Sequence, residues 1–572
     1  MQQVQRLDRF RILRGVYEPL RIFLVWLLVA GSCSLMAMSH SSLSTELTLD
    51  EQDQLQARLE LFYGSDSPHV MSLKIPKVNV ATGRAGGRGE ISVEGSLIRN
   101  PSLKELAGAK SSPKFVQMRK HWFQKRFPRN GANESWSSYS GGDRVSDLLE
   151  SYFDESEISY DLDKIPNRGE ISRSYWSGDY WSMNSGLTSY RYSTEKAFEL
   201  YQDAITSYLQ PEEWSQLWGS LPPNKWSEEV QKWSPSEKYD LLVGDENFTL
   251  TKEQKGEGAD FVNSEGKVES WFGICDGWAP ASVFVPTPNR SIKTLGARGV
   301  SIPWYPDDVR ALASLAWSNG DYPNNFVGRR CEVTTPKVYK NGRISDEDCA
   351  DTNPATFHLA LGFLLGKKGI PFIMDASFDA EVWNQPILAY EIRYFNPLNP
   401  RQRSFKWSDV SVPYDEAFKT KDRFQKPLTR GYRRAQKYFD GAVKAIVGVQ
   451  TTLVYLAEYE ANSKLQPQEN VTERVTYTYD LELHEKEGAL VPLGGEWHSN
   501  AHPDFLWLPQ NHAVATGRWD KEISKFELSS VVPPALTEVA AKGSKNGYPL
   551  CSVIESLVKA SSEGADYQCP RN

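Results

Sequence analysis

One stretch of the chain alternates strictly between apolar and polar residues. In 474–483 every second side chain is apolar, and these side chains are Val475, Tyr477, Tyr479, Leu481 and Leu483. This spacing is typical of a strand with one buried face. The polar segment 484–488 follows, and apolar residues return at 489–491. The pattern therefore predicts a β-hairpin, with His484 in its turn.

Two further segments extend this picture. Residues 306–317 open with proline and two acidic residues and place Val309, Leu312 and Ala316 on one face, which predicts an amphipathic helix. Residues 441–458 are dense in β-branched side chains, which favours a strand. We therefore expect an α+β fold with a helical lobe and a mostly antiparallel sheet.

The N-terminal part of the chain has a different composition. Residues from about 40 to 170 are rich in Ser, Gly and charge, which predicts loops with short helices. We divide the chain into a signal peptide or anchor, an N-terminal extension that could be a pro-region, a catalytic region and a C-terminal segment, with bounds 1–38, 39–170, 171–515 and 516–572.

The first residues have the order of a targeting segment. Arginines outnumber acids before the uncharged apolar run 22–30, and small residues follow it, as in a secretory signal. Membrane anchoring and a lipid on Cys33 are the alternatives. The net charge of −8 and the lack of a basic stripe disfavour nucleic-acid binding. We expect an exported protein, either released or attached to a membrane through this segment.

The spacing of the cysteines is compatible with the disulfides of an exported protein. Beyond Cys33 the chain has five cysteines, and two pairs of neighbours lie 18 residues apart, Cys331 with Cys349 and Cys551 with Cys569. Disulfides between neighbours would leave Cys275 free, although the sequence equally allows some or all thiols to stay reduced.

Cys275 lies between Gly273 and Gly277 and between Trp271 and Trp278. Glycines permit close backbone approach, and indole rings can shield a thioester from water. This setting favours a nucleophile at a tight turn, and hence acyl transfer or amide hydrolysis. The alternative is a buried structural cysteine.

A nucleophilic thiol needs a base and a group that orients the base. His358 leads into an apolar run and Asp375 ends another. We therefore predict a triad of Cys275, His358 and Asp375, with Asp375 beside the histidine on a neighbouring strand. This order is that of papain-like and transglutaminase-like sites. Asp379 and Asn384 are alternative orienting groups.

Two other histidines compete with His358 as the base. His498 and His502 are four residues apart, a spacing that could also hold a metal. Gly494, Gly495 and Pro503 disfavour the helix that would align them.

Several blocks resemble the transglutaminase elicitor family, typified by the secreted oomycete cell-wall transglutaminase. These blocks are Ser174-Tyr-Trp-Ser-Gly-Asp-Tyr-Trp181, residues 234–245, Gly273-Ile-Cys-Asp-Gly-Trp-Ala-Pro-Ala281, Asn353-Pro-Ala-Thr-Phe-His358, Val382-Trp-Asn-Gln-Pro386, Gly494-Gly-Glu-Trp497 and Pro503-Asp-Phe-Leu-Trp507. They occur in consistent order from about 170 to 510.

The resemblance implies calcium-dependent crosslinking of protein glutamine and lysine side chains. Cys275 would form the thioester and His358 would move the proton. The backbone N–H of Cys275, with Trp271 as a second donor, would hold the oxyanion. The partners would be proteins with accessible glutamine and lysine.

The sequence also departs from the family pattern. Asp276 follows the cysteine where relatives commonly carry histidine, and its charge opposes thiolate formation. The residues after Pro386 differ from the family's elicitor peptide, so immune recognition is not inferred. No loop with calcium-binding spacing is visible, and the acidic run 346–348 has the character of a solvated loop.

Two alternatives use the same residues differently. A cysteine amidase or protease would accept water in place of lysine, and the triad alone does not separate it from a transferase. A non-catalytic surface protein would keep the fold without the chemistry, but Cys275 and His358 are both present.

Overall fold

The computed structural model describes most of the chain after residue 42. The described residues are 43–64, 71, 75–80, 145–192, 200–206, 223–296, 299–328, 352–376, 381–414, 416, 443–523, 525–528, 532–562 and 567–569. The predicted signal or anchor, together with Cys33, Cys331, Cys349 and Asp379, lies outside these residues. None of the described helices has the length and apolarity needed to cross a membrane.

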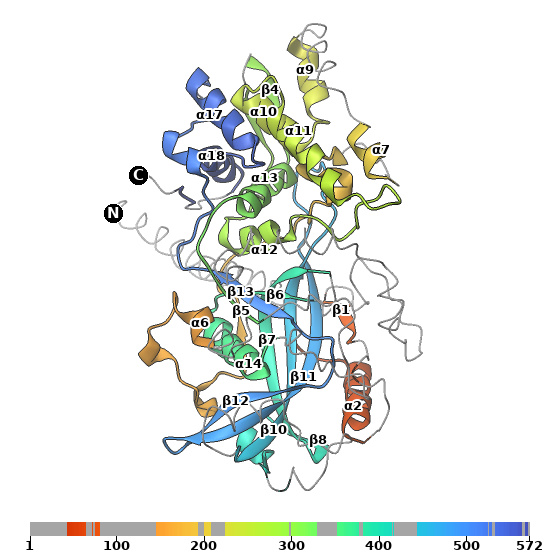
Figure 1. The fold of residues 1–572 in the computed structure, drawn as a ribbon, viewed down its shortest axis with the longest axis vertical. Coiled ribbons are helices and arrows are strands. Elements are labelled where there is room, and N and C mark those ends of the chain that lie inside the picture. The colour runs from red at the N-terminus through yellow and green to blue at the C-terminus, as the bar shows by residue number, and fades with distance from the viewer. Residues whose placement is uncertain are drawn as a thin grey trace, which may run out of the picture.

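A large antiparallel sheet forms the lower part of the molecule in Figure 1. Its main path runs β1-β11-β10-β7-β6-β13-β5, while β12 pairs with β11, β2 and β8 pair with β7, and β9 pairs with β10. The strands are β1 (Lys77–Asn79), β2 (Arg168–Glu170), β5 (Asn324–Gly328), β6 (Ile373–Asp375), β7 (Asn384–Asn396), β8 (Asn399–Ser404), β9 (Val412–Pro413), β10 (Ala445–Ala457), β11 (Val471–Lys486), β12 (Ala489–Trp497) and β13 (Phe505–Pro509).

Most helices gather in a lobe above this sheet (Figure 1). The lobe contains α7 (Tyr201–Thr206), α9 (Pro223–Val230), α10 (Pro235–Val243), α11 (Thr249–Gly256), α12 (Cys275–Phe284), α13 (Pro306–Asn319), α17 (Pro534–Ser544), α18 (Cys551–Ser561) and the hairpin of β3 (Ile292–Leu295) and β4 (Ser301–Trp304).

Three of the described helices lie beside the sheet instead. They are α2 (Leu49–Gly64), α6 (Val145–Leu149) and α14 (Pro354–Ala360), and α14 continues as a π-helix over Leu361–Lys367. Short 3₁₀ helices occur at Glu155–Glu157, Leu162–Lys164, Met183–Ser185, Leu187–Ser189, Glu257–Phe261, Trp407–Asp409 and Arg518–Glu522.

The elements predicted from hydrophobic pattern are present. The expected helix is α13, with Pro306 in its first turn and Asp308 accepting from the backbone N–H of Tyr305. The expected strands are β10 and β11, and β11 turns into β12 through Glu487 and Gly488, which both have positive φ. The mixture of helices with an antiparallel sheet confirms the α+β prediction.

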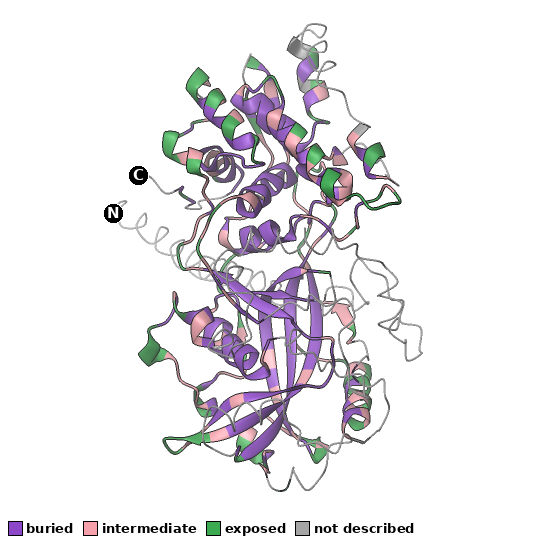
Figure 2. Cartoon of the chain, viewed as in Figure 1, coloured by how far each residue is buried: buried purple, intermediate pink, exposed green. Residues whose placement is uncertain are grey.

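The expectation that β11 has one exposed face is wrong. Both faces are buried from Thr472 to Leu483, apart from a half-buried Thr478, as the purple strands of Figure 2 show. Phe357 of α14 packs edge-on against the ring of Tyr479 on one face. On the other face the Tyr63 hydroxyl of α2 donates to Asp480 at 2.5 Å. Alternation identified the strand correctly, but the N-terminal segment covers its polar face.

The disulfide prediction is confirmed where the structure describes it. Cys551 and Cys569 are bonded, with their Cα atoms 5.9 Å apart. Within the described residues Cys275 is the free cysteine, and it is buried.

Candidate active site

Cys275 is the first residue of α12, at the boundary between the helical lobe and the sheet (Figure 1). The two glycines beside it are required by close packing. A Cβ at Gly273 would lie 2.5 Å from the Tyr180 carbonyl oxygen, and one at Gly277 would lie 2.1 Å from the Ser314 carbonyl oxygen. The glycines therefore let α12 pack directly on α13 and fix the start of the helix against the chain at Tyr180.

The thiol of Cys275 faces the strand β7. Its Sγ lies 3.6 Å from the Val382 carbonyl oxygen and 3.4 Å from Nδ2 of Asn384, which donates to the sulfur. The indole N–H of Trp507 donates to Oδ1 of Asn384 at 2.8 Å. Because that bond identifies the oxygen end of the amide, the nitrogen end must point at the sulfur. A helix N-terminus and an oriented amide thus converge on one buried thiol.

Asp375 lies close to this pair, although in a different relation from the one predicted. It ends β6 and is the antiparallel partner of Asn384. Its Oδ1 accepts from the backbone N–H of Trp383 at 3.0 Å. Asp375 thereby stabilises the hairpin that presents Asn384 to the thiol. Of the predicted orienting groups, Asn384 reaches the sulfur directly.

The structure does not bring His358 to Cys275, which corrects the predicted triad. His358 is on α14, and its ring nitrogens contact the hydroxyls of Tyr479 at 3.0 Å and Tyr394 at 3.3 Å. Tyr394 is ten residues from Asn384 along β7, which is about 33 Å of extended strand. Side chains cannot close that gap. The apolar run at His358 forms a helix packed on the middle of the sheet, whereas the thiol lies at the sheet's end.

Burial also makes His358 a poor base. It is fully buried, and desolvation lowers the pKa of its imidazole to about 3. The ring is therefore neutral throughout the physiological range, with both nitrogens engaged by tyrosine hydroxyls. These properties are those of a structural histidine.

The other predicted groups contact partners other than the sulfur. His498 is 3.2 Å from Asp480 and stacks on Phe62 of α2, while His502 stacks on Trp497. The Trp271 indole N–H, the proposed second oxyanion donor, donates to Glu269 at 2.6 Å.

The electrostatic surroundings keep Cys275 protonated. Burial, the charge of Asp276 and that of Glu458 together raise the pKa of the thiol to about 12, and the hydrogen bonds from Asn384 oppose this rise. Asp276 is itself buried and accepts from the Ser318 hydroxyl at 3.2 Å. The predicted opposition between Asp276 and thiolate formation therefore has the expected sign.

Glu458 follows β10 and faces the strand that holds Asn384. Both of its carboxylate oxygens accept from Nε2 of Gln385, at 3.0 and 2.9 Å. Burial is the main reason why the pKa of Glu458 is raised to about 7. A carboxyl group that titrates near neutrality thus lies within electrostatic reach of the nucleophile.

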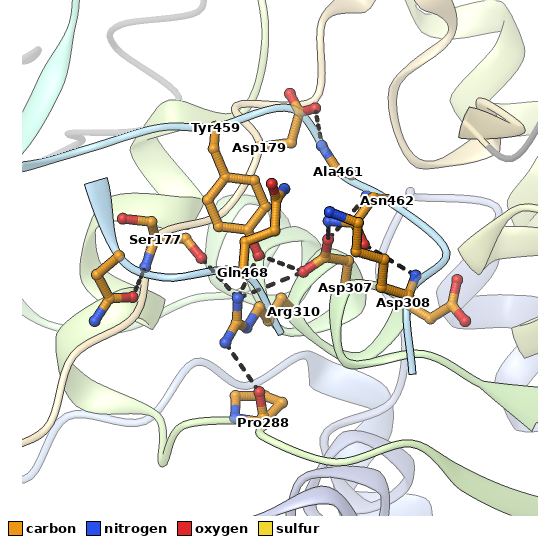
Figure 3. A network of polar contacts seen from close by, with 12 residues as sticks. Ser177, Asp179, Pro288, Asp307, Asp308, Arg310, Tyr459, Ala461, Asn462 and Gln468 are labelled. Atoms are coloured by element: carbon orange, nitrogen blue, oxygen red, sulfur yellow. Dashed lines mark hydrogen bonds and ion pairs between the residues drawn. The ribbon is translucent and has the colours of Figure 1, made fainter. Parts of the chain in front are cut away.

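A buried polar network holds the segment that follows Glu458 (Figure 3). Arg310 of α13 donates to the hydroxyl of Tyr459, to the Ser177 carbonyl and to the Pro288 carbonyl. Asp307 accepts from the Tyr459 hydroxyl and from the backbone N–H of Asn462. The network ties the end of β10 to the helical lobe and so fixes Glu458 relative to α12.

Comparison with known proteins decides the family. The model of the family described as "Transglutaminase elicitor" matches residues 146–430 and 420–531, which together make up more than half of the chain. The chain belongs to the transglutaminase elicitor family.

Other comparisons add less. The crystal structure of the GP42 transglutaminase from Phytophthora sojae is similar over 71% of this chain and 99% of that chain, at 19% identity and a TM-score of 0.44. At this identity and TM-score, the similarity supports no conclusion about this chain. A search of curated proteins finds no match.

Three groups around the thiol were missed by the sequence reasoning, and two of them are in the family's blocks. Gln385 is inside the Val382–Pro386 block, next to Asn384, and Trp507 ends the last block. Glu458 is a lone acid at the end of the β-branched run that predicted β10. An acid or amide that directly adjoins a buried strand was the available signal.

Calcium dependence stays a prediction from the family resemblance. The described residues contain no group of three or more His, Cys, Asp or Glu side chains that could hold a metal ion.

Proposed function

We propose that this protein is an exported protein-glutamine γ-glutamyltransferase that works through a thioester on Cys275. Membership in the transglutaminase elicitor family supports the reaction class. The observation that carries the proposal is the buried thiol at the start of α12, which accepts from an Asn384 amide held in orientation by Trp507. We also propose that α12 facing an antiparallel sheet is a papain-like core.

In the first half-reaction, the Cys275 sulfur attacks the carboxamide carbon of a protein glutamine. The backbone N–H of Cys275 and the Asn384 amide would stabilise the oxyanion. The thiol proton passes to the leaving nitrogen, the C–N bond breaks, and ammonia leaves. A thioester remains on Cys275.

In the second half-reaction, a lysine amine attacks the thioester carbon. The C–S bond breaks, an isopeptide C–N bond forms, and the sulfur recovers the proton that the amine loses. Water in place of the amine would give a glutamate side chain. A transferase and an amidase therefore differ in whether an amine or water reaches the thioester.

The test is incorporation of a fluorescent primary amine into a glutamine-bearing protein, with and without calcium. We expect labelling by wild type and none by Cys275→Ser. Release of ammonia without labelling would favour an amidase, and cleavage of the protein would favour a protease. Equal labelling by both proteins would contradict the proposed nucleophile.

Export is part of the proposal because two features favour an oxidising compartment. One is the basic and apolar order of residues 1–38. The other is the Cys551–Cys569 disulfide. Mass spectrometry of the mature protein would distinguish cleavage after the apolar run from a lipid on Cys33 and from an intact N-terminus.

A further inference from the structure

A lysine of the chain's own N-terminal segment lies at the candidate active site. Lys77 begins β1, which pairs with β11 at the end of the sheet's main path, with Lys77 opposite Val475. Its Nζ donates to the Ala376 carbonyl oxygen at 3.2 Å and lies 5.9 Å from the ring centroid of Tyr455. The ammonium group therefore has a carbonyl and an aromatic face as neighbours.

The hairpin of β6 and β7 links this ammonium to the thiol. The backbone N–H of Ala376 donates to the Trp383 carbonyl at 2.9 Å. The residues on either side of Trp383 are Val382 and Asn384, which are the two hydrogen-bond partners of the Cys275 sulfur. The amine and the nucleophile thus contact adjacent positions of one hairpin.

Glu458 is electrostatically coupled to both groups. Its charge raises the pKa of Cys275, and the charge of Lys77 lowers the pKa of Glu458. The hydrogen bonds from Gln385, the residue next to Asn384, place this carboxylate beside the hairpin that both groups contact.

Gln385 adds an unused acceptor beside this carboxylate. Because Nε2 donates to both oxygens of Glu458, Oε1 must point away from Glu458. Oε1 is buried and has no hydrogen-bond partner among the residues that the structure describes, and the whole residue is only 5% exposed. A buried acceptor without a donor is costly, whereas an ammonium group brings three donors.

We propose a subsite for the side-chain ammonium of the acceptor lysine, formed by Glu458, Gln385, the Ala376 carbonyl and the Tyr455 ring. The side chain of Lys77 occupies the path by which that ammonium group would enter the subsite. This inference rests on the proposed function, because it assigns the place of the second substrate. The carboxylate, the two carbonyl-type oxygens and the ring are the groups that bind an alkylammonium ion.

The neighbouring strand shows how the substrate chain would bind. β1 contributes three residues to the pairing with β11, and the backbone N–H of Val80 extends it to Thr472. An extended lysine-bearing segment of a substrate could form the same hydrogen bonds with β11 in place of β1. Its lysine would then occupy the position of Lys77.

The subsite also supplies the proton transfer that the amine requires. An ammonium ion cannot attack a thioester, so one proton moves from nitrogen to the Glu458 carboxylate. The neutral amine then attacks the carbonyl carbon, the C–S bond breaks, and the second proton moves to the departing sulfur. Glu458 returns its proton to water, which balances the cycle.

The test compares a cationic acceptor with an uncharged one in Glu458→Gln. Cadaverine carries ammonium groups at neutral pH, whereas hydroxylamine is uncharged and gives a hydroxamate. We expect the KM for cadaverine to rise at least about tenfold, since a half-buried charge partner is lost, and the KM for hydroxylamine to stay within about twofold. Glu460→Gln, an exposed acid two residues further on, is the matched control and should change neither value.

The outcomes separate the subsite from the proposed function. A wild-type protein that makes no hydroxamate overturns the proposed function and the subsite with it. Hydroxamate formation with an equal change in both KM values, or in neither, overturns the subsite alone.

Lys77→Ala gives an independent readout that does not alter the carboxylate. If Lys77 competes for the subsite, its removal should lower the KM for cadaverine about threefold or more and leave kcat for hydroxylamine unchanged. Lys464→Ala, an exposed lysine, is the control. An unchanged or higher KM for cadaverine in Lys77→Ala would contradict the internal occupant.

Discussion

Cys275 and His358 are both buried, yet their surroundings differ in kind. His358 lies in a layer of aromatic rings, and tyrosine hydroxyls contact both of its nitrogens. Cys275 lies between two parts of the molecule, at the end of a helix, with an oriented amide and a titrating carboxyl nearby. The first arrangement stabilises the sheet, and the second positions reactive groups around a sulfur.

This difference shows why a conspicuous residue type does not identify a catalytic one. Both residues adjoin apolar runs and both are in the family's blocks. The histidine is neutral and fully engaged in the fold. The thiol is surrounded by groups whose own orientation is fixed by further contacts, as a site for chemistry requires.

Removal of the sulfur should have the largest effect. We expect Cys275→Ala to lower amine incorporation by at least about 10³-fold, because Cys275 is the free cysteine among the residues that the structure describes. Thermal unfolding of the variant should stay close to that of wild type, since alanine fills most of the same volume. Residual activity above about one tenth would contradict the assignment.

Removal of the oriented amide should have the next largest effect. Asn384→Ala deletes the donor to Sγ, and kcat should fall about 10²-fold, as for other oxyanion donors. Trp507→Phe removes the N–H that orients the amide, together with part of the buried ring volume, and should lower kcat less than Asn384→Ala does. Asn396→Ala, at the far end of the same strand, should leave kcat unchanged. If Asn396→Ala is as harmful as Asn384→Ala, the effect arises from the strand and not from the site.

Asp276, which follows the cysteine in the chain, allows a more specific test with a smaller expected effect. The pKa of Cys275 is raised to about 12, so the thiolate fraction, and with it alkylation by iodoacetamide, should rise about tenfold per pH unit from pH 7 to 9. Asp276→Asn removes a charge that raises this pKa, so alkylation at pH 8 should be about three- to tenfold faster. Slower alkylation of Asp276→Asn would show that Asp276 activates the thiol.

Replacement of the histidine should change stability and barely change catalysis. His358→Gln disrupts two buried hydrogen bonds and should lower the free energy of unfolding by about 1–3 kcal/mol. The kcat of the folded variant should stay within about twofold of wild type. Chemical denaturation with activity measured in the native baseline separates the two quantities.

The pH dependence of that difference gives a second check. The pKa of His358 is lowered in the folded state, so the unfolded chain binds the proton more readily. Wild type therefore loses the stability that neutral His358 contributes as pH falls below about 6.5 towards the pKa of His358 in the folded protein. The stability gap between wild type and His358→Gln should shrink over that range. A gap that grows would contradict the neutral, structural histidine.

Local pattern predicted the elements better than it predicted their contacts. The alternation in 474–483 and the helix start at Pro306 are local properties, and both elements are present. The burial of the polar face of β11 depends on α2, which comes from a segment that looked irregular in sequence. Period and capping therefore identify an element but not what covers it.

The nucleophile could be predicted and its partners could not. The glycines around Cys275 have a local signature that the packing of α12 explains. The contact with Asn384 depends on the register of β6 and β7, and that with Trp507 depends on β13, over a hundred residues further along the chain. His358 was preferred because of its residue type, but its helix packs about ten strand positions from the thiol.

The rate of thioester formation on Cys275 tests the central claim most directly. Wild type, His358→Gln and Asn384→Ala would each be mixed with a glutamine peptide without an amine, and the acyl-enzyme would be followed by intact-protein mass spectrometry. We predict formation at a near wild-type rate in His358→Gln and about 10²-fold more slowly in Asn384→Ala. Loss of the acyl-enzyme in a stably folded His358→Gln, with a normal rate in Asn384→Ala, would contradict the account.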